Sequence, residues 1–209
     1  MKTYKTEQES FWAGSFGDDY ISRNESKKLL AGNLNMFTEI FNKTINVNSV
    51  LELGANIGMN ILAINNLLPD SKTSAIEINS KAFEQLKTVC TGEAYLSSIL
   101  DIDFKKHDQY DFVFTKGVLI HINPDELSSV YEAMYKLSKE YICVAEYYNP
   151  SPVAIEYRGE RNKLFKRDFA GDLLDKYNDL KLVDYGFKYK RDNNYPQDDI
   201  TWFLLKKSN

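Results

Sequence analysis

The stretch Val50-Leu51-Glu52-Leu53-Gly54-Ala55-Asn56-Ile57-Gly58 decides how this sequence is expected to fold. An apolar run of strand length leads into a glycine turn, and residues 57–68 then carry the apolar spacing of a helix. Gly54 lets the backbone turn tightly and approach a ligand, and Gly58 lets the helix pack close to the strand. This strand–turn–helix unit predicts a parallel α/β sheet, with a ligand site beyond the carboxyl end of the strand.

The sequence beyond this stretch continues the alternation of strands and helices. Further strands are expected over 72–78, 93–98, 110–115 and 141–147, with helices over 79–90 and 124–139. Near the end, the apolar runs 179–190 and 198–207 have no helix between them, which requires an antiparallel pair at one edge of the sheet. We therefore expect a Rossmann-like α/β fold, a mostly parallel seven-stranded sheet with one antiparallel strand and helices on both faces.

Composition limits the classes of protein to which the chain can belong. Its 209 residues contain no visible linker or repeat, so one compact domain is expected, with residues 1–46 as an N-terminal helical cap or lid and 47–209 as the core. Two histidines and two cysteines, without metal-ligand spacing, argue against a zinc site and a disulfide framework. The net charge of −4 argues against a general nucleic-acid binder. No signal peptide or membrane span is recognisable, so a soluble, cytoplasmic protein is expected.

Two carboxylates narrow the choice of ligand. Glu77, at the end of the second expected strand, can accept hydrogen bonds from both ribose hydroxyls of a nucleoside. Glu52, inside the turn motif, would repel a diphosphate but favour an ammonium or sulfonium group. The third glycine of the dinucleotide fingerprint is also missing, which disfavours a dehydrogenase. The residues point to S-adenosylmethionine, although a strand-to-helix turn alone would need a glycine for structural reasons.

From about residue 47 onward the chain resembles the class I S-adenosylmethionine-dependent methyltransferases. The turn motif, Glu77 and the segment YDFVFTKGVLIHINP (110–124) carry this resemblance. More narrowly, the chain resembles the pseudaminic acid biosynthesis-associated methylases, through FWAGSFGDDYISRN (11–24), EYYNPSP (146–152), YRGERNKLFKRDFAGDLLDKY (157–177) and PQDDITWFLLKK (196–207). The resemblance implies an enzyme of surface glycan or nonulosonic acid biosynthesis, with an acidic sugar or nucleotide sugar as acceptor. Methyl transfer itself needs no metal, which fits the scarcity of histidine and cysteine.

The expected cofactor site gathers residues from several motifs. The sequence departs from the pattern of many class I enzymes at two points. Asn56 stands where glycine is common. No acid follows the third strand, so Ser98 and the Ile99 backbone would hold the adenine. Tyr20 and Arg23 are suitable donors to the methionine carboxylate. The full expected set is Tyr20, Arg23, Glu52, Gly54, Asn56, Gly58, Glu77, Ile78, Ser98, Ile99, Lys116 and Gly117.

Catalysis and acceptor binding are expected near the ends of the fourth and fifth strands. A hydroxyl acceptor must lose a proton, and His121 follows the fourth strand, where it would act as a base or merely order the loop. His107 is expected at the surface. Five basic residues and one acid lie between residues 157 and 167, so an anionic acceptor is expected. The expected acceptor-binding residues are Glu146, Tyr147, Tyr148, Asn149, Arg158, Lys166 and Arg167.

The sequence is compatible with several functions. O-methylation of a small acceptor is favoured, and N-methylation of an amino sugar or another small metabolite follows, since an amine needs less help from a base. A non-catalytic S-adenosylmethionine-binding subunit would keep the same turn and acid. Methylation of protein or RNA and a dehydrogenase are less favoured. The N-terminal Phe11 and Trp12 could close over the cofactor or simply dock the first helix on the core. The oligomeric state is open.

Overall fold

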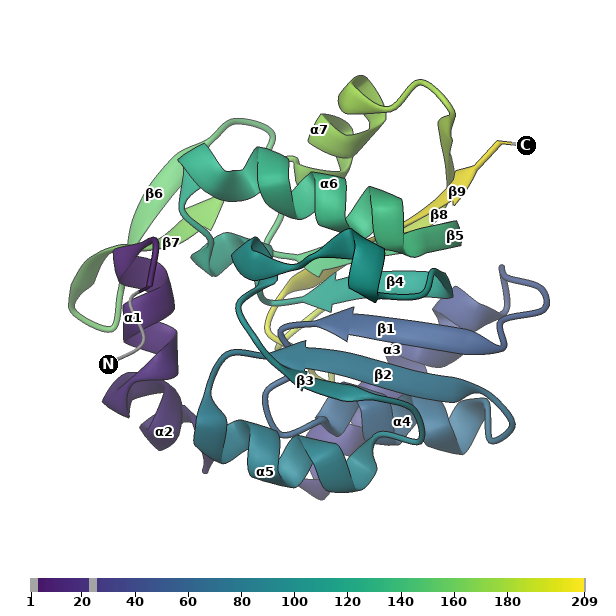
Figure 1. Ribbon diagram of the computed structural model, residues 1–209, viewed down its shortest axis with the longest axis horizontal. Helices are drawn as coiled ribbons and strands as arrows, with labels where there is room; N and C mark the ends of the chain where they lie inside the picture. The colour runs from purple at the N-terminus through teal and green to yellow at the C-terminus, as the bar shows by residue number, and fades with distance from the viewer. Residues whose placement is uncertain (1–3, 23–25, 209) are drawn as a thin grey trace.

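The computed structural model describes residues 4–22 and 26–208. Its central sheet has seven strands in the spatial order β3-β2-β1-β4-β5-β9-β8 (Figure 1). Neighbouring strands are parallel except where β9 pairs with β5 and with β8, so β9 is the reversed strand. The expected sheet and its reversed strand are therefore confirmed. The strands are β1 (Ser49–Leu53), β2 (Lys72–Glu77), β3 (Ala94–Leu96), β4 (Tyr110–Lys116), β5 (Ser138–Glu146), β8 (Leu180–Lys188) and β9 (Ile200–Lys207).

Helices cover both faces of this sheet, as expected (Figure 1). Residues of α3 and α4 pack in one core cluster with one face of the sheet, and residues of α6 and α7 pack in another. Because both faces are covered, the central strands are nearly continuous apolar runs, and Phe112, Val113 and Phe114 are fully buried. The helices of these layers are α3 (Lys27–Phe41), α4 (Met59–Leu67), α5 (Ser80–Val89), α6 (Leu127–Leu137) and α7 (Phe169–Lys176). In the described part of the chain no helix is long and apolar enough to cross a membrane.

Side-chain caps explain where several helices begin. Thr6 and Glu9 form a reciprocal capping box at the start of α1 (Glu7–Ala13). Ser26 accepts a hydrogen bond from the Leu29 amide at the start of α3, and Asn79 caps α5. The remaining helical segments are α2 (Ser15–Ile21) and the 3-10 turns η1 (Ile99–Asp101), η2 (Phe104–Lys106), η3 (Leu119–His121) and η4 (Pro124–Glu126).

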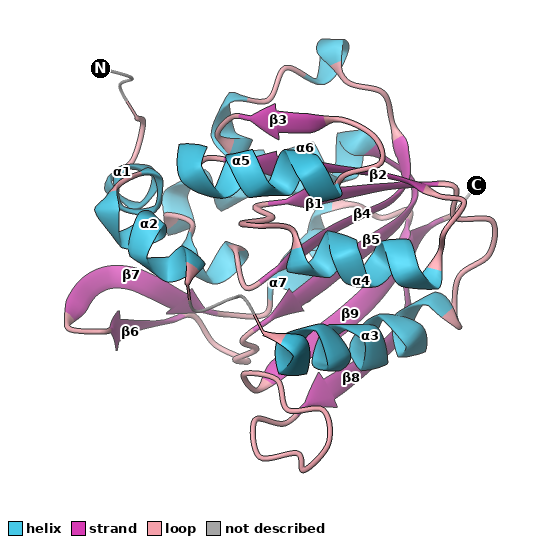
Figure 2. Ribbon diagram, turned by 90° about the horizontal axis from the view of Figure 1, so that it is seen from below, coloured by secondary structure: helices cyan, strands magenta, loops and turns pink. Residues whose placement is uncertain are grey.

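An antiparallel hairpin, β6 (Val153–Tyr157) and β7 (Glu160–Lys166), follows β5 and lies apart from the main sheet (Figure 2). Neither this hairpin nor α7 was expected from the sequence pattern. β6 is exposed almost throughout, and the two buried residues of β7, Lys163 and Leu164, are consecutive, so the hairpin lacks the alternation that marks a half-buried strand. Its turn has two left-handed residues, Arg158 (φ 54°) and Gly159 (φ 84°), as tight hairpins require.

The two N-terminal helices lie beside this hairpin (Figure 1). The Gln8 amide donates to the Asn162 carbonyl oxygen over 2.9 Å, and the Lys163 ammonium lies 3.2 Å from the Glu7 carboxylate. By contrast, α3 belongs to the core, where Met36, Phe37 and Ile40 are fully buried. Of the helices described within residues 1–46, α1 and α2 therefore lie beside the hairpin, whereas α3 packs in the core.

Candidate functional site

A cavity of about 470 Å³ lies beyond the carboxyl ends of the central strands. Gly54 after β1, Ile78 after β2, Gly117 after β4 and Tyr147 after β5 contribute to its wall. This is the position that the strand–turn–helix pattern predicted for a ligand. Among the expected cofactor residues, those that line the cavity are Tyr20, Gly54, Asn56, Glu77, Ile78, Ser98, Ile99, Lys116 and Gly117. Arg23 lies outside the described residues.

The glycine turn brings the backbone to the edge of this cavity. Gly54 has a φ of 81°, and a Cβ atom there would lie 2.7 Å from the Val118 side chain. Gly58, with a φ of 87°, precedes α4, and a Cβ atom there would lie 3.0 Å from Leu86. Gly58 itself does not line the cavity, so its role is the close packing of α4 against α5. Both glycines therefore have a conformational reason to be present.

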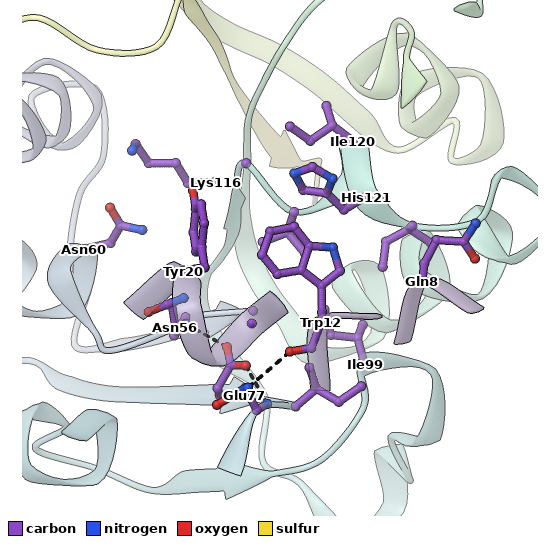
Figure 3. A pocket seen from close by; sticks show the side chains of 18 of the residues that line it. Gln8, Trp12, Tyr20, Asn56, Asn60, Glu77, Ile99, Lys116, Ile120 and His121 are labelled. Carbon is purple, nitrogen blue, oxygen red and sulfur yellow. Dashed lines mark hydrogen bonds between the residues drawn. The ribbon is translucent and has the colours of Figure 1, made fainter. Parts of the chain in front are cut away.

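Glu77 is tied to the turn by its carboxylate. One oxygen accepts a hydrogen bond from the backbone N–H of Asn56 and the other from the backbone N–H of Asn79, each over 2.7 Å. The backbone of Asn56 reaches this position in a left-handed conformation, with a φ of 50°. Burial raises the pKa of Glu77, although hydrogen bonds from the backbone oppose the shift. The carboxylate is fixed at the cavity wall, where it can accept hydrogen bonds from a bound ligand (Figure 3).

Glu52, expected to contact the cofactor, is fully buried and does not line the cavity. The Asn60 amide donates to one of its oxygens over 2.6 Å, and the other oxygen has no partner among the described residues. Burial raises the pKa of Glu52 to about 8. Asn60 does line the cavity, so its side chain joins the buried Glu52 to the cavity wall.

The loop after β3 is joined to the first helix. The Ser98 hydroxyl donates to the Glu9 carboxylate, and it also accepts a hydrogen bond from the Leu100 amide. Both side chains are buried, and both residues line the cavity. Because the Ser98 hydroxyl already donates to Glu9, Ser98 and Ile99 can contact an adenine ring through their backbone atoms.

The N-terminal helices close one side of the cavity. The side-chain amide of Asn79 donates a hydrogen bond to the Asp18 carboxylate in α2 over 2.9 Å. The Lys81 ammonium lies 2.5 Å from the other Asp18 oxygen. The Trp12 indole lies against His121, with ring centroids 4.6 Å apart. Trp12 and Tyr20 both line the cavity (Figure 3). The contacts of α1 and α2 with α5 and with His121 place these two helices beside the cavity.

His121 lines the cavity from η3, after β4. Its Nδ1 lies 2.5 Å from the Lys163 carbonyl oxygen, and its ring packs between Trp12 and Tyr157. Burial lowers the pKa of His121 to about 4, despite this hydrogen bond. The imidazole is therefore neutral at physiological pH and carries its proton on Nδ1, which leaves the Nε2 lone pair as an acceptor. His107, expected at the surface, is partly buried against Tyr95.

Glu146, expected to bind the acceptor, instead supports the loop after β4. Its carboxylate accepts from the backbone amides of Val118 and Leu119 over 3.0 Å and of Ile120 over 3.5 Å. It is buried, does not line the cavity, and its pKa is raised by burial to about 7. Because these amides lead into η3, Glu146 helps to position His121.

The other residues expected to bind the acceptor divide into two groups. Tyr147 and Arg158 line the cavity, whereas Tyr148, Asn149, Lys166 and Arg167 do not. The Arg167 guanidinium lies 2.9 Å from Asp172, and the Lys166 ammonium lies 5.0 Å from the centroid of the Tyr147 ring. Several other residues that line the cavity were not expected from the sequence, among them Gln8, Asn33, Tyr157, Gln197 and Asp198. Tyr157, Gln197 and Asp198 lie in the quoted motifs, but nothing in the local sequence marks them as cavity residues.

A second, more open cavity of about 370 Å³ adjoins the first and shares Tyr20, Arg158 and Asp198 with it. Lys28 of α3 and Lys190 of the loop after β8 also line this outer cavity. The Lys190 ammonium lies 3.3 Å from Asp199. No group of three or more potential metal ligands occurs among residues 4–22 and 26–208.

Comparisons with known proteins give matches only among solved structures; no family model and no curated protein sequence matches. The magnesium protoporphyrin IX methyltransferase of Synechocystis PCC 6803, with bound S-adenosylmethionine, superposes with a TM-score of 0.68 at 11% identity, over 99% of this chain and 100% of that one. The 1,6-didemethyltoxoflavin-N1-methyltransferase of Burkholderia thailandensis, with bound S-adenosylhomocysteine, gives 0.70 at 12% identity, over 100% and 94%. The N-methyltransferase NodS of Bradyrhizobium japonicum WM9 gives 0.63 at 11%, over 85% and 97%. The chain therefore has the fold of the class I methyltransferases.

Proposed function

We propose that this protein is an enzyme that transfers a methyl group from S-adenosylmethionine to a small molecule. The observation that carries the proposal is the cavity at the carboxyl ends of β1, β2 and β4, with the Glu77 carboxylate fixed beside the glycine turn. Proteins of the same fold have S-adenosylmethionine or S-adenosylhomocysteine bound and act as methyltransferases on small molecules. The narrower identification with the pseudaminic acid-associated methylases rests on sequence resemblance alone.

The residues of the cavity fit the proposed cofactor. Its volume of about 470 Å³ lies in the range typical of small-molecule sites. Glu77 would accept hydrogen bonds from the ribose hydroxyls, and the backbone at Ser98 and Ile99 would contact the adenine. The buried Glu52 carboxyl would release its proton beside a ligand with positive charge but not beside the diphosphate of a dinucleotide. This combination supports S-adenosylmethionine rather than NAD.

Bound S-adenosylmethionine supplies an activated methyl group on a sulfonium, so the protein has to align the acceptor and exclude water. Trp12, Tyr157 and His121 form an aromatic wall on one side of the cavity. We assign His121 as the residue that accepts a hydrogen bond from the acceptor through Nε2. As a neutral imidazole it would orient a hydroxyl or an amine and receive its proton as methyl transfer proceeds.

The acceptor is proposed to be anionic and sugar-derived, with O-methylation favoured. Arg158 projects from the hairpin turn into the cavity lining, and Lys28 and Lys190 contribute two further cations at the outer cavity. Asp198 in the same wall and Asp199 beside Lys190 offset part of this positive charge. Surface glycan or nonulosonic acid synthesis in the cytoplasm is the setting that the sequence resemblance implies.

One experiment tests both donor and acceptor. Purified protein is incubated with methyl-labelled S-adenosylmethionine and a panel of acidic sugars, nucleotide sugars and amino sugars, and mass spectrometry locates the added methyl group. Labelled product carrying an anionic group supports the proposal, and the modified atom decides between O- and N-methylation. Thermal-shift measurements with S-adenosylmethionine, S-adenosylhomocysteine and NAD run in parallel. Stabilisation by NAD alone would contradict the proposed donor, and binding without turnover would favour a non-catalytic subunit.

A further inference from the structure

A pair of side-chain amides at the cavity wall has a hydrogen-bond donor left over. The Gln197 amide donates to the Asn33 Oδ1 atom over 3.0 Å, and both residues line the cavity of about 470 Å³, the inner cavity. Asn33 is 1% exposed and Gln197 is 5% exposed. The Asn33 Nδ2 atom has no hydrogen-bond partner among the described residues. A buried donor without an acceptor costs free energy, unless a bound group supplies the acceptor.

A close approach of two segments holds this amide pair in place. Gly32 lies inside α3, where glycine is less favourable than alanine. A Cβ atom at Gly32 would lie 2.9 Å from the Gln197 Nε2 atom and 3.1 Å from the Pro196 carbonyl oxygen. The backbone N–H of Gln197 also donates to the Tyr189 carbonyl oxygen over 3.3 Å. Glycine at position 32 therefore allows the loop after β8 to pack closely against α3.

Through Gln197, Asn33 reaches the region where the inner and outer cavities meet. Leu29, one helical turn before Asn33 on the same face of α3, lines both cavities, and so does Gln197. Ser26 and Lys28 line the outer cavity at the start of α3, so the positive end of the helix dipole lies there. We call the region between the two cavities the junction. The residues that line both cavities are Tyr20, Leu29, Arg158, Pro196, Gln197 and Asp198.

The charges at the junction and in the outer cavity favour a bound anion. Arg158 lines both cavities, and Lys28 lines the outer one. Lys190 also lines the outer cavity, but its ammonium is paired with Asp199 over 3.3 Å. Asp198 is the opposing charge, and it lines both cavities. With the Lys190 pair set aside, two positive charges and one negative charge remain on the described residues that line the outer cavity.

We propose that the junction binds an oxyanion group of the acceptor, a carboxylate or a phosphate, and that Asn33 donates a hydrogen bond to this group. The Arg158 guanidinium supplies the paired N–H donors that such a group prefers. Arg158 follows Tyr157, whose ring lies 4.9 Å from that of His121. One small molecule can therefore place its anionic group at the junction and its methyl-accepting atom at His121. The inference rests on the proposed function and adds a residue that selects the acceptor.

Phosphorus NMR titrations with inorganic phosphate test this site on protein saturated with S-adenosylhomocysteine. Asn33→Asp keeps the oxygen that accepts from Gln197 and replaces the free donor with a second oxygen. We expect it to weaken phosphate binding about tenfold, and Asn33→Leu, which removes the donor without adding a charge, to weaken it about threefold to tenfold. Asp198→Asn removes the opposing charge and should tighten phosphate binding about threefold. Calorimetry should show that S-adenosylhomocysteine binds all three variants within about threefold of the wild type.

The matched control is Asn35→Asp, which adds the same charge two residues further along α3. Asn35 lines neither cavity, and its Oδ1 atom accepts from the Lys188 ammonium over 2.6 Å. This variant should bind phosphate as the wild type does. Competition distinguishes the source of the oxyanion. Displacement of phosphate by acetate supports a site for either group, and resistance to acetate supports a phosphate ester as acceptor.

Four results would overturn the oxyanion site while leaving the proposed methyl transfer intact. They are no saturable binding of phosphate by the wild type, equal losses in Asn33→Asp and Asn35→Asp, displacement of phosphate by sodium chloride as readily as by acetate at the same ionic strength, and a loss of S-adenosylhomocysteine binding in Asn33→Leu. The last result would place Asn33 on the cofactor instead. A wild-type protein that binds neither S-adenosylhomocysteine nor S-adenosylmethionine would overturn the proposed function itself.

Discussion

The Nδ1 atom of His121 lies 2.5 Å from the carbonyl oxygen of Lys163, which joins the loop after β4 to the hairpin strand β7. A carbonyl oxygen can only accept, so Nδ1 carries the proton. This contact gives one residue two separable functions. Nδ1 holds the hairpin against the core, while Nε2 is the acceptor that the proposed reaction uses.

His121→Ala should lower turnover at least tenfold while S-adenosylhomocysteine binds nearly as in the wild type, because the proposed contact is with the acceptor. His121→Asn can replace the Nδ1 donor but not the Nε2 acceptor. We expect it to recover the thermal stability lost in His121→Ala without recovering turnover. Steady-state kinetics, calorimetry and thermal denaturation measure these quantities. Wild-type turnover in either variant would exclude His121 as the acceptor of the proton.

Glu52 should make the protein less stable as the pH rises. Its pKa is about 8 in the folded state, against an ordinary 4.5, so the folded protein retains a proton that the unfolded chain has released. Stability contributed by this group is present below about pH 4.5 and is lost progressively as the pH rises to about 8. Glu52→Gln removes the titration. It should exceed the wild type in free energy of unfolding at pH 8.5 by an amount on the order of a few kcal/mol.

Urea denaturation of both proteins at intervals from pH 5 to 8.5 measures this difference, which should shrink toward pH 5. Comparison of the two proteins cancels the contributions of His121 and of other titrating groups. A difference that is constant across the range would mean that Glu52 has an ordinary pKa in the folded protein.

Trp12 should report directly on the closing of the lid. It is one of two tryptophans; the other, Trp202, is buried in the core cluster with α3. Ligand binding should change the fluorescence of the wild type and of Trp202→Phe but not that of Trp12→Phe. Trp12→Ala removes the ring contact with His121 and should weaken S-adenosylhomocysteine binding about threefold to tenfold. An unaltered affinity would show that Trp12 only docks α1 on the core.

The outer cavity predicts a charge effect on acceptor binding that depends on position. Lys27 and Lys28 both lie in the first turn of α3, but only Lys28 lines the outer cavity. Glutamate at either position interacts alike with the helix dipole, so the two variants should be similarly stable. Lys28→Glu and Arg158→Glu should raise the KM for the acceptor about threefold to tenfold, whereas Lys27→Glu should not. Equal effects of Lys27→Glu and Lys28→Glu on the KM would mean that Lys28 acts by long-range attraction alone and does not contact the acceptor.

Arg167→Ala separates stability from binding in the basic segment. The Arg167 guanidinium pairs with Asp172, and Arg167 does not line either cavity. We expect a loss of about 1 kcal/mol in free energy of unfolding, measured by urea denaturation, with an unchanged KM for the acceptor. An increase in KM comparable to that of Arg158→Glu would restore Arg167 to the acceptor site.

The sequence predicted the sheet because the signals for it are local. Val50–Leu53 and residues 110–115 read as buried strands, and both form central strands of the sheet. The hairpin at 153–166 was missed because β6 is exposed almost throughout and the buried residues of β7, Lys163 and Leu164, are consecutive, so no alternation could mark it. The alternation of apolar and polar residues reveals a strand only when one of its faces is buried and the other is exposed.

What the sequence by itself determined is the αβ alternation, the glycine turn and the acid at the end of β2, since each follows from strand period, backbone freedom or spacing. Only the tertiary structure decided which charges meet the cavity. Arg158 lines the cavity, whereas Arg167 pairs with Asp172. Lys28 and Lys190, from distant parts of the chain, line the outer cavity. Side-chain direction and burial depend on contacts far apart in sequence. The neutral state of His121 therefore becomes visible only in the folded protein.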